Sequence, residues 1–391
     1  MKFITKNILL LSLVSLFTDI SSEMLFPVFP IYLQQIGFTG TAIGLLEGFA
    51  EMLASYGKGF FGSWSDKLGK RKPFVLVGYA LSAFAKLLMG VSALVPLIFS
   101  ARLLDRTGKG IRTAARDAML SGESNKENKG KVFGFHRAID TLGAVIGPCI
   151  ALLLLHQGFG LQSMFSFAFI PAALSLVYIF FLREKKFEQH RDTIINPFNF
   201  FSYWKQSTAE FKRLMKVLLV FTLFNSSDVF LILWVKKLTN FETAIEAYII
   251  YNLVYAIASY PAGYLVDKLG NKKILLFGFL FFITTYSFLP FAASSSEVFV
   301  LFAVYGLYAA CVEGNTKAWI TNVCAEKETA TALGFYGAST GLLQIATGLF
   351  AGLIWDIYTG KSLFLISATG VAMCLILFMF VPSNKKIGLQ V

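Results

Sequence analysis

The sequence predicts an all-α membrane protein of twelve transmembrane helices, arranged as two six-helix halves. Its composition is 56% hydrophobic and only 15% charged, whereas a soluble domain carries about 25% charged residues. Apolar runs of about twenty residues recur along the chain, and a helix of that length crosses a hydrocarbon core of about 30 Å. The two parts of the chain also repeat each other, which predicts the two halves.

Polar breaks separate twelve apolar segments, and each is expected to form one helix. The segments run near 8–34, 41–64, 73–95, 97–120, 131–156, 161–183, 213–237, 243–266, 273–293, 297–320, 331–357 and 361–381. The long polar stretch in the middle predicts an N-terminal half (1–183), a central loop (184–212) and a C-terminal half (213–391). Aromatic side chains in that loop favour a short interfacial helix. They are Phe200, Phe201, Tyr203 and Trp204.

The net charge of +12 would suggest nucleic acid as a partner for a soluble protein. Here the basic loops fall on one side of the predicted membrane, which orients the helices instead. Both termini and the central loop are therefore expected in the cytoplasm, with the chain in a bacterial inner membrane. The four cysteines lie in or near apolar segments without CxxC spacing, so no disulfide, metal site or cofactor is expected.

Two pairs of segments show the internal repeat. GSWSDKLGKRK (62–72) matches GYLVDKLGNKK (263–273), and the shift from Asp66 to Asp267 is 267 − 66 = 201 residues. GFHRAIDTLGAVIGP, from Gly134, matches GFYGASTGLLQIATG, from Gly334, with a shift of 334 − 134 = 200. Duplicated halves that enclose a site near the bilayer midplane are typical of transporters.

The repeated loop resembles the signature Gly-x-x-x-Asp-x-x-Gly-Arg/Lys-Arg/Lys of the major facilitator superfamily. The matching residues are Gly62, Asp66, Gly69, Lys70 and Arg71 in the first copy, and Gly263, Asp267, Gly270 and Lys272 in the second. The resemblance covers the whole chain and implies gating by these loops as the two halves rock. The glycines suit close helix approach and a tight turn, and the aspartates suit a helix cap or an ion pair.

The segment 102–117, RLLDRTGKGIRTAARD, places a cluster of charges inside an apolar helix. Its charged side chains are Arg102, Asp105, Arg106, Lys109, Arg112, Arg116 and Asp117. RLLDRTGKG resembles the superfamily pattern Arg-x-x-x-Gly-x-Gly-x-Gly, which implies a part for Arg102 in proton coupling. A phosphate-binding loop is excluded, because the Gly-x-x-x-x-Gly-Lys-Ser/Thr frame is missing.

Helical spacing places Asp105, Lys109, Arg112 and Arg116 on one face. Charges at membrane depth face a water-filled cavity or an oppositely charged partner, so the sequence predicts either a substrate and proton site or a set of ion pairs. The candidate acidic partners are Asp19 and Glu23 in the first helix, Glu47 and Glu51 in the second, and Asp140 in the fifth. Paired carboxylates can also share a proton or, less in keeping with this sequence, hold a hard metal ion.

Fewer charges mark the C-terminal half. Asn225 and Asp228 occupy the position that TDISSE holds in the first helix, and Glu313 and Lys317 stand four residues apart in the tenth. These residues are expected either to pair or to contact solute and protons. In the fifth helix, Gly143, Gly147 and Pro148 form GAVIGP, which resembles the core of the superfamily's antiporter signature; close helix packing is the alternative.

Together these features predict a transporter without enzymatic activity that exports a small charged or amphipathic solute in exchange for protons. An acid among Asp19, Glu23 and Asp228 would exchange the proton, while cations of 97–120 contact or gate an anionic or zwitterionic solute. Proton-coupled uptake of an organic anion and a membrane receptor or scaffold without transport are the alternatives. The expected partners are the solute, protons and the lipid bilayer, with the chain acting as a monomer.

Overall fold

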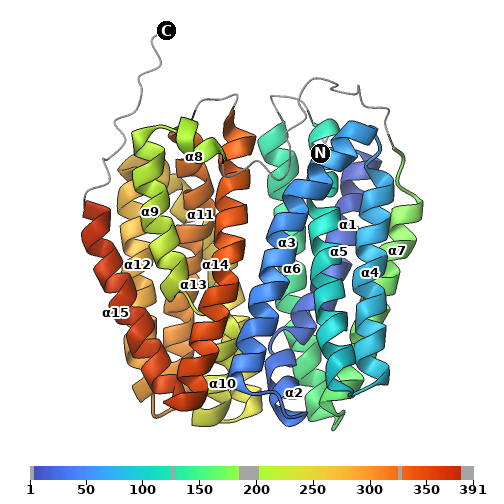
Figure 1. The fold of residues 1–391 in the computed structure, drawn as a ribbon. Coiled ribbons are helices and arrows are strands. Elements are labelled where there is room, and N and C mark those ends of the chain that lie inside the picture. Colours follow the sequence, from blue (N-terminus) through green and yellow to red (C-terminus); the bar gives the residue numbers. More distant parts are fainter. Residues whose placement is uncertain (1–3, 125–127, 185–201, 325–327, 380–391) are drawn as a thin grey trace. The chain divides into compact units, whose positions relative to one another are not determined.

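The computed structural model describes residues 4–124, 128–184, 202–324 and 328–379, and within them it contains helices and no strand. The chain divides into two compact units, residues 1–197 and 198–391. Each unit is a bundle of long helices (Figure 1). The predicted all-α fold class is therefore confirmed.

The first unit contains helices at all six predicted positions. They are α1 (Lys6–Leu25), α2 (Phe29–Gln35), α3 (Gly40–Leu68), α4 (Lys72–Val91), α5 (Val95–Gly122), α6 (Lys129–His156) and α7 (Leu161–Phe180). The first predicted span is broken into α1 and α2 at residues 26–28, where Pro27 lacks a backbone N–H for the helix ladder. This break bends the chain beside the charged residues of α1.

The second unit repeats this order. Its elements are α8 (Tyr203–Gln206), α9 (Ala209–Phe224), α10 (Asp228–Leu238), α11 (Phe241–Leu269), α12 (Asn271–Phe288), the 3₁₀ turn η2 (Leu289–Phe291), α13 (Ser295–Asn322), α14 (Thr329–Ile357) and α15 (Gly360–Met379). The span that corresponds to α1 and α2 is broken as well, at residues 225–227.

The helix pairings in the two units confirm the internal repeat. In the first unit, α1 packs against α6 and α7, α5 against α3 and α4, and α4 against α7. In the second, α9 packs against α14 and α15, α13 against α11 and α12, and α12 against α15. When each helix of the first unit is replaced by its counterpart in the second, the first set of contacts becomes the second set. The duplicated sequence therefore produces a duplicated fold.

Within the described residues, ten helical segments are long and apolar enough to cross a membrane. α3 and α5 occupy the remaining predicted spans but do not meet that criterion. These two helices carry Glu47, Glu51 and the charges of 102–117. Outward-facing Phe84, Val177 and Phe180 are between 51% and 67% exposed, as expected for a surface in contact with lipid.

The loop glycines have the backbone conformation that the signature requires. Gly69 ends α3 with φ 63°, and Gly270 ends α11 with φ 86°; side chains with a Cβ rarely adopt these values. Gly62 lies so close to α5 that a Cβ on it would be 2.8 Å from the Cβ of Ala114, whereas nothing lies within 4 Å of the same position at Gly263. The close approach is thus a property of the first copy.

The short helix α8 covers part of the aromatic segment predicted to lie at the membrane interface. Tyr203 is 3% exposed and packs edge-on against Phe211, and Trp204 stacks on Phe335. These rings therefore contact the helices of their own unit. Phe200 and Phe201, like most of the central loop, lie outside the described residues.

Candidate functional site

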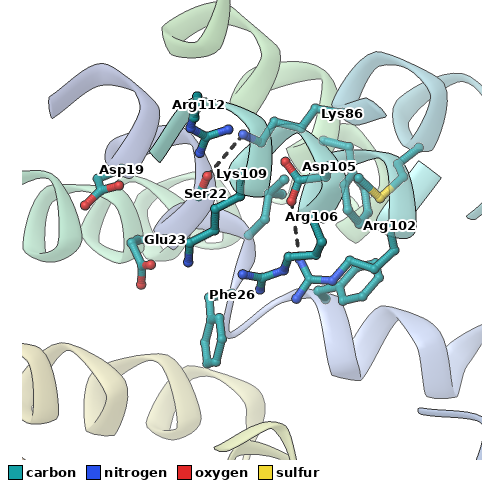
Figure 2. A pocket seen from close by; sticks show the side chains of 14 residues that line it. Asp19, Ser22, Glu23, Phe26, Lys86, Arg102, Asp105, Arg106, Lys109 and Arg112 are labelled. Carbon is teal, nitrogen blue, oxygen red and sulfur yellow. Dashed lines mark hydrogen bonds and ion pairs between the residues drawn. The ribbon is translucent and has the colours of Figure 1, made fainter. Parts of the chain in front are cut away.

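A pocket in the first unit collects seven of the charged residues that the sequence singles out (Figure 2). Its empty volume is about 560 Å³, which includes space open to solvent. Its charged lining residues are Asp19, Glu23, Lys86, Arg102, Asp105, Arg106, Lys109 and Arg112. Three helices, α1, α4 and α5, supply them.

Two acidic residues of α3 form ion pairs with arginines that line this pocket, and the two ion pairs differ in geometry and burial. Arg102 donates from Nε and Nη2 to the two carboxylate oxygens of Glu47, at 2.9 Å each, and the Glu47 side chain is only 4% exposed. Arg106 reaches Glu51 through one contact of 3.4 Å, and the Glu51 side chain is 43% exposed. Arg102 is therefore held in a buried bidentate pair, whereas Arg106 is held loosely.

The charges of α5 divide by their position along the helix. Of the four residues that the spacing places on one face, Asp105, Lys109 and Arg112 line the pocket and Arg116 does not; Arg102 and Arg106 line it as well. Asp105 is 7% exposed, with Oδ2 at 3.7 Å from Nη1 of Arg102, and Lys109 is exposed. Arg102, Asp105 and Arg106 thus take part in ion pairs, whereas Lys109 forms none within 4 Å in the described part of the chain.

Arg116, on the same face, belongs to a separate polar cluster. It donates to Ser15 Oγ at 2.9 Å and to Asp117 at 2.9 Å. Ser15 Oγ in turn lies 3.0 Å from Nε2 of His136, which is 5% exposed. This cluster extends the polar interior of the unit beyond the pocket along α5.

The carboxyl groups of Asp19 and Asp140 meet where α1 packs against α6. The two groups are close enough to interact electrostatically. Asp140 is 7% exposed, and its Oδ2 accepts a bond of 3.3 Å from Arg137. Oδ1 of Asp140 is buried and has no donor among the described residues.

Gly143 and Gly147 of GAVIGP bring α6 against α1 at this point. A Cβ on Gly143 would lie 2.7 Å from the carbonyl oxygen of Leu16, and one on Gly147 would lie 2.6 Å from that of Ile20. Pro148 follows inside α6 without ending the helix. The motif therefore supports the close helix packing that was its alternative explanation, and that packing positions Asp19 opposite Asp140.

In the second unit, the predicted residues lie beside a cluster of tyrosines. Asp228, at the start of α10, accepts a bond of 2.6 Å from the Tyr305 hydroxyl, and Glu313 accepts one of 2.7 Å from Tyr255. Among the described residues Lys317 forms no ion pair with Glu313 within 4 Å, so the pairing that was one of the two alternatives for them is not observed. Oδ1 of Asn225 is buried without a hydrogen-bond donor in the described part of the chain.

The two copies of the loop signature are stabilised differently. Asp66 forms an ion pair of 3.1 Å with Arg71, which also donates to the Ala118 carbonyl at 2.9 Å and so ties the loop to α5. In the second copy Asp267 is exposed and Lys272 lies over the ring of Phe378, 5.8 Å from its centre. Amides hold this loop, since Asn271 donates to Asn315 at 2.8 Å.

Sequence reasoning missed Lys86, which lines the pocket from α4 and is 2% exposed. A single lysine within the apolar run LSAFAKLLMG was the available signal. The tyrosine cluster was missed as well, because its members come from several helices. As for a metal site, the described residues contain no group of three or more potential ligands.

Comparison with known proteins places the chain among transporters. The sequence model of the Major Facilitator Superfamily matches residues 11–252 and 236–390. A protein of Methanocaldococcus jannaschii, described as an uncharacterized MFS-type transporter, is 36% identical over 365 residues, covering 90% of this chain and 89% of that protein. A multi-drug resistance efflux pump PmrA homolog of Lactococcus lactis is 23% identical, covering 86% and 84%.

The fold is also that of solved transporters. A crystal structure of a mutant of the nucleoside transporter NupG superposes with a TM-score of 0.81 at 15% sequence identity. The match covers 96% of this chain and 100% of that one. At this identity the likeness concerns the fold alone.

Proposed function

The chain belongs to the major facilitator superfamily, and we propose that it exports a small charged solute in exchange for protons. Members of this superfamily are multi-pass membrane proteins that carry small molecules. In the proposed cycle, alternating access comes from rocking of the two units, a motion typical of folds built from repeated halves. The single chain is the working unit, and both termini lie in the cytoplasm.

The observation that carries the proton coupling is the contact between Asp19 and Asp140. Asp19 lines the pocket, while Asp140 is buried behind it with one oxygen that lacks a donor in the described chain. Two neighbouring carboxylates repel each other unless one of them holds a proton. The pair is therefore a site at which a proton binds directly beside a solute.

Exchange requires that solute and proton exclude each other. A cationic group of the solute that approaches Asp19 and Glu23 would favour the ionised carboxylates and expel the shared proton. Linkage is reciprocal, so protonation of the pair would release that cationic group by the same free energy. The relative described as an efflux pump supports export as the direction of solute movement.

Proton-coupled uptake of an organic anion is the second candidate. Its support is the composition of the pocket lining, in which Lys86, Arg102, Arg106, Lys109 and Arg112 face Asp19, Glu23 and Asp105. An anion near these cations would bind more tightly when the carboxyl pair holds a proton, and the two would then travel together. The two candidates differ in whether protons move in the opposite direction to the solute, as in exchange, or in the same direction, as in co-transport.

Reconstituted protein tests the proposal. Purified wild-type chain and the Asp140→Asn variant are placed in liposomes that contain a pH-sensitive dye, and pools of anionic, zwitterionic and cationic metabolites are added outside. Solute-dependent proton movement is expected for wild type, and Asp140→Asn should lose it while still exchanging labelled solute. Proton movement of equal size in wild type and variant would refute the role of the pair.

A further inference from the structure

Lys86 and Arg112 are buried cations whose charge the structure leaves without a dedicated partner. Lys86 is 2% exposed and Arg112 is 6% exposed. In the described part of the chain, no carboxylate oxygen lies within 4 Å of either group, although ion pairs form at Arg102, Arg106 and Arg116. Burying an unpaired charge is costly, and such groups normally have a counter-ion.

The observed partners of these two cations are neutral. Lys86 donates from Nζ to Ser22 Oγ at 3.2 Å. Arg112 donates to Ser82 Oγ, and its guanidinium lies over the Tyr79 ring, 4.5 Å from the ring centre. These contacts orient the two groups and satisfy some of their hydrogen-bonding capacity. They supply no negative charge.

Asp105 is too widely shared to neutralise the cluster. Its carboxylate interacts electrostatically with Lys86, Arg102, Arg106 and Arg112 together. Among the described residues, its one ion pair within 4 Å joins Oδ2 to Arg102 Nη1 at 3.7 Å. Figure 2 shows the ends of Lys86 and Arg112 directed toward each other beside Ser22, with Asp105 on their far side.

Close packing of α4 on α5 fixes this arrangement. A Cβ on Gly78 would lie 2.6 Å from the Gly108 carbonyl oxygen, and one on Gly108 would lie 2.9 Å from Ser82 Oγ. The helices therefore approach each other at their glycines, one turn from Ser82 and Arg112. Because both cations belong to tightly packed helices, they are held near each other at a fixed separation.

We propose that Lys86 and Arg112 bind an oxyanion group of the transported solute, a carboxylate or a phosphate. An ammonium and a guanidinium side by side donate several charge-assisted hydrogen bonds to such a group. The hydroxyl of Ser22 provides a further donor at the same place. The inference deepens the proposed function by naming the chemistry of the solute, and it rests on that function for the identity of the pocket.

Binding of simple oxyanions to the purified full-length protein tests this site. Inorganic phosphate and succinate are titrated by calorimetry and thermal unfolding in detergent, at constant ionic strength set with sodium chloride. Saturable binding and a rise in Tm are expected for one or both probes. Lys86→Met and Arg112→Gln should each weaken binding about tenfold or more, because each removes a charged hydrogen-bond donor from a desolvated site.

Two further variants exclude trivial explanations. Lys67→Gln removes one positive charge from an exposed position of the same unit and should bind both probes as wild type does. Lys86→Arg keeps the charge and should restore part of the affinity lost in Lys86→Met, which separates loss of the site from loss of folding. Absence of saturable binding by wild type, or unchanged affinity in folded Lys86→Met and Arg112→Gln, would overturn the proposal. Proton exchange with solutes that lack an oxyanion would leave the transporter in place and remove only this site.

Discussion

At the scale of single residues, the two arginine pairs beside the pocket differ in what their acids contribute. Glu47 is buried and holds Arg102 through two bonds of 2.9 Å, whereas Glu51 is 43% exposed and meets Arg106 at 3.4 Å. A buried pair that loses one partner leaves an uncompensated charge, while an exposed pair is largely screened. We therefore expect the first pair to contribute to stability, and the second to be weak enough to open during the proposed cycle.

Neutralising these acids should reveal the difference. Glu47→Gln is expected to destabilise the protein by about 3–5 kcal/mol, and Glu51→Gln by less than about 1 kcal/mol. Thermal and denaturant unfolding of the detergent-solubilised variants measures both effects. A Glu51→Gln variant as unstable as Glu47→Gln would show that Arg106 is held as firmly as Arg102.

In the proposed cycle Asp19 and Asp140 share one proton, so substitutions at the two positions should have the same effect. Asp19→Asn and Asp140→Asn are each expected to abolish proton-coupled exchange, and the double variant should be no worse than either single one. The measurement is proton flux and labelled-solute exchange in liposomes at several pH values. Proton-coupled exchange that survives in one of the single variants would mean that the two acids do not act as one unit.

Helical spacing alone decides part of the arrangement within 102–117. It places Asp105, Lys109, Arg112 and Arg116 on one face, and the first three of these line the pocket while Arg116 lies in a separate cluster. Which acid meets which arginine depends on how neighbouring helices are rotated, and that information is not periodic. Lys86 was missed for this reason, since its importance arises from Arg112 on another helix.

At the scale of helices, the sequence predicts the order of the helices and the internal repeat. Small residues determine where neighbouring helices approach each other. The breaks at 26–28 and 225–227 were not predicted, because each lies inside a segment, 8–34 or 213–237, that was expected to form one helix. The packing of α4 on α5 depends on Gly78 and Gly108, which no motif identified as a pair. Such contacts follow from the absence of a side chain on both facing helices, so a single helix does not reveal them.

Alanine at these glycines should separate the two helices. Gly78→Ala would place a methyl group 2.7 Å from the Arg112 Cβ, and overpacking of this kind costs about 1–3 kcal/mol. Oxyanion binding should weaken together with Tm in Gly78→Ala and Gly108→Ala. The matched control is Gly134→Ala in α6, where nothing lies within 4 Å of the added atom; equal effects in all three variants would refute the packing argument.

At the scale of the whole molecule, the positive loops predict the orientation. A reporter fused after Val391, or inserted into 185–201, should read as cytoplasmic, because loops rich in Lys and Arg remain on that side. A reporter at 157–160, in the short loop between α6 and α7, is the control and should read as external. Periplasmic activity of the C-terminal fusion would overturn the orientation.

The gate predictions concern both copies of the repeated loop. Asp66→Asn should reduce transport more than Asp267→Asn, because Asp66 forms an ion pair with Arg71 and through it contacts α5, whereas Asp267 is exposed. Transport rates at matched expression measure the difference. Full activity in both variants would exclude these aspartates from gating.

The direction of proton movement tests the central claim, exchange of solute for protons, most directly. The chemistry of the pocket fits a zwitterion, with its oxyanion at Lys86 and Arg112 and its cationic group at Asp19 and Glu23. Liposomes that contain wild-type protein and a pH-sensitive dye are given amino acids or phosphoethanolamine from outside. Exchange predicts that the internal pH rises as solute enters and that Asp19→Asn abolishes the change; a fall in internal pH with solute entry would instead establish co-transport and contradict the account.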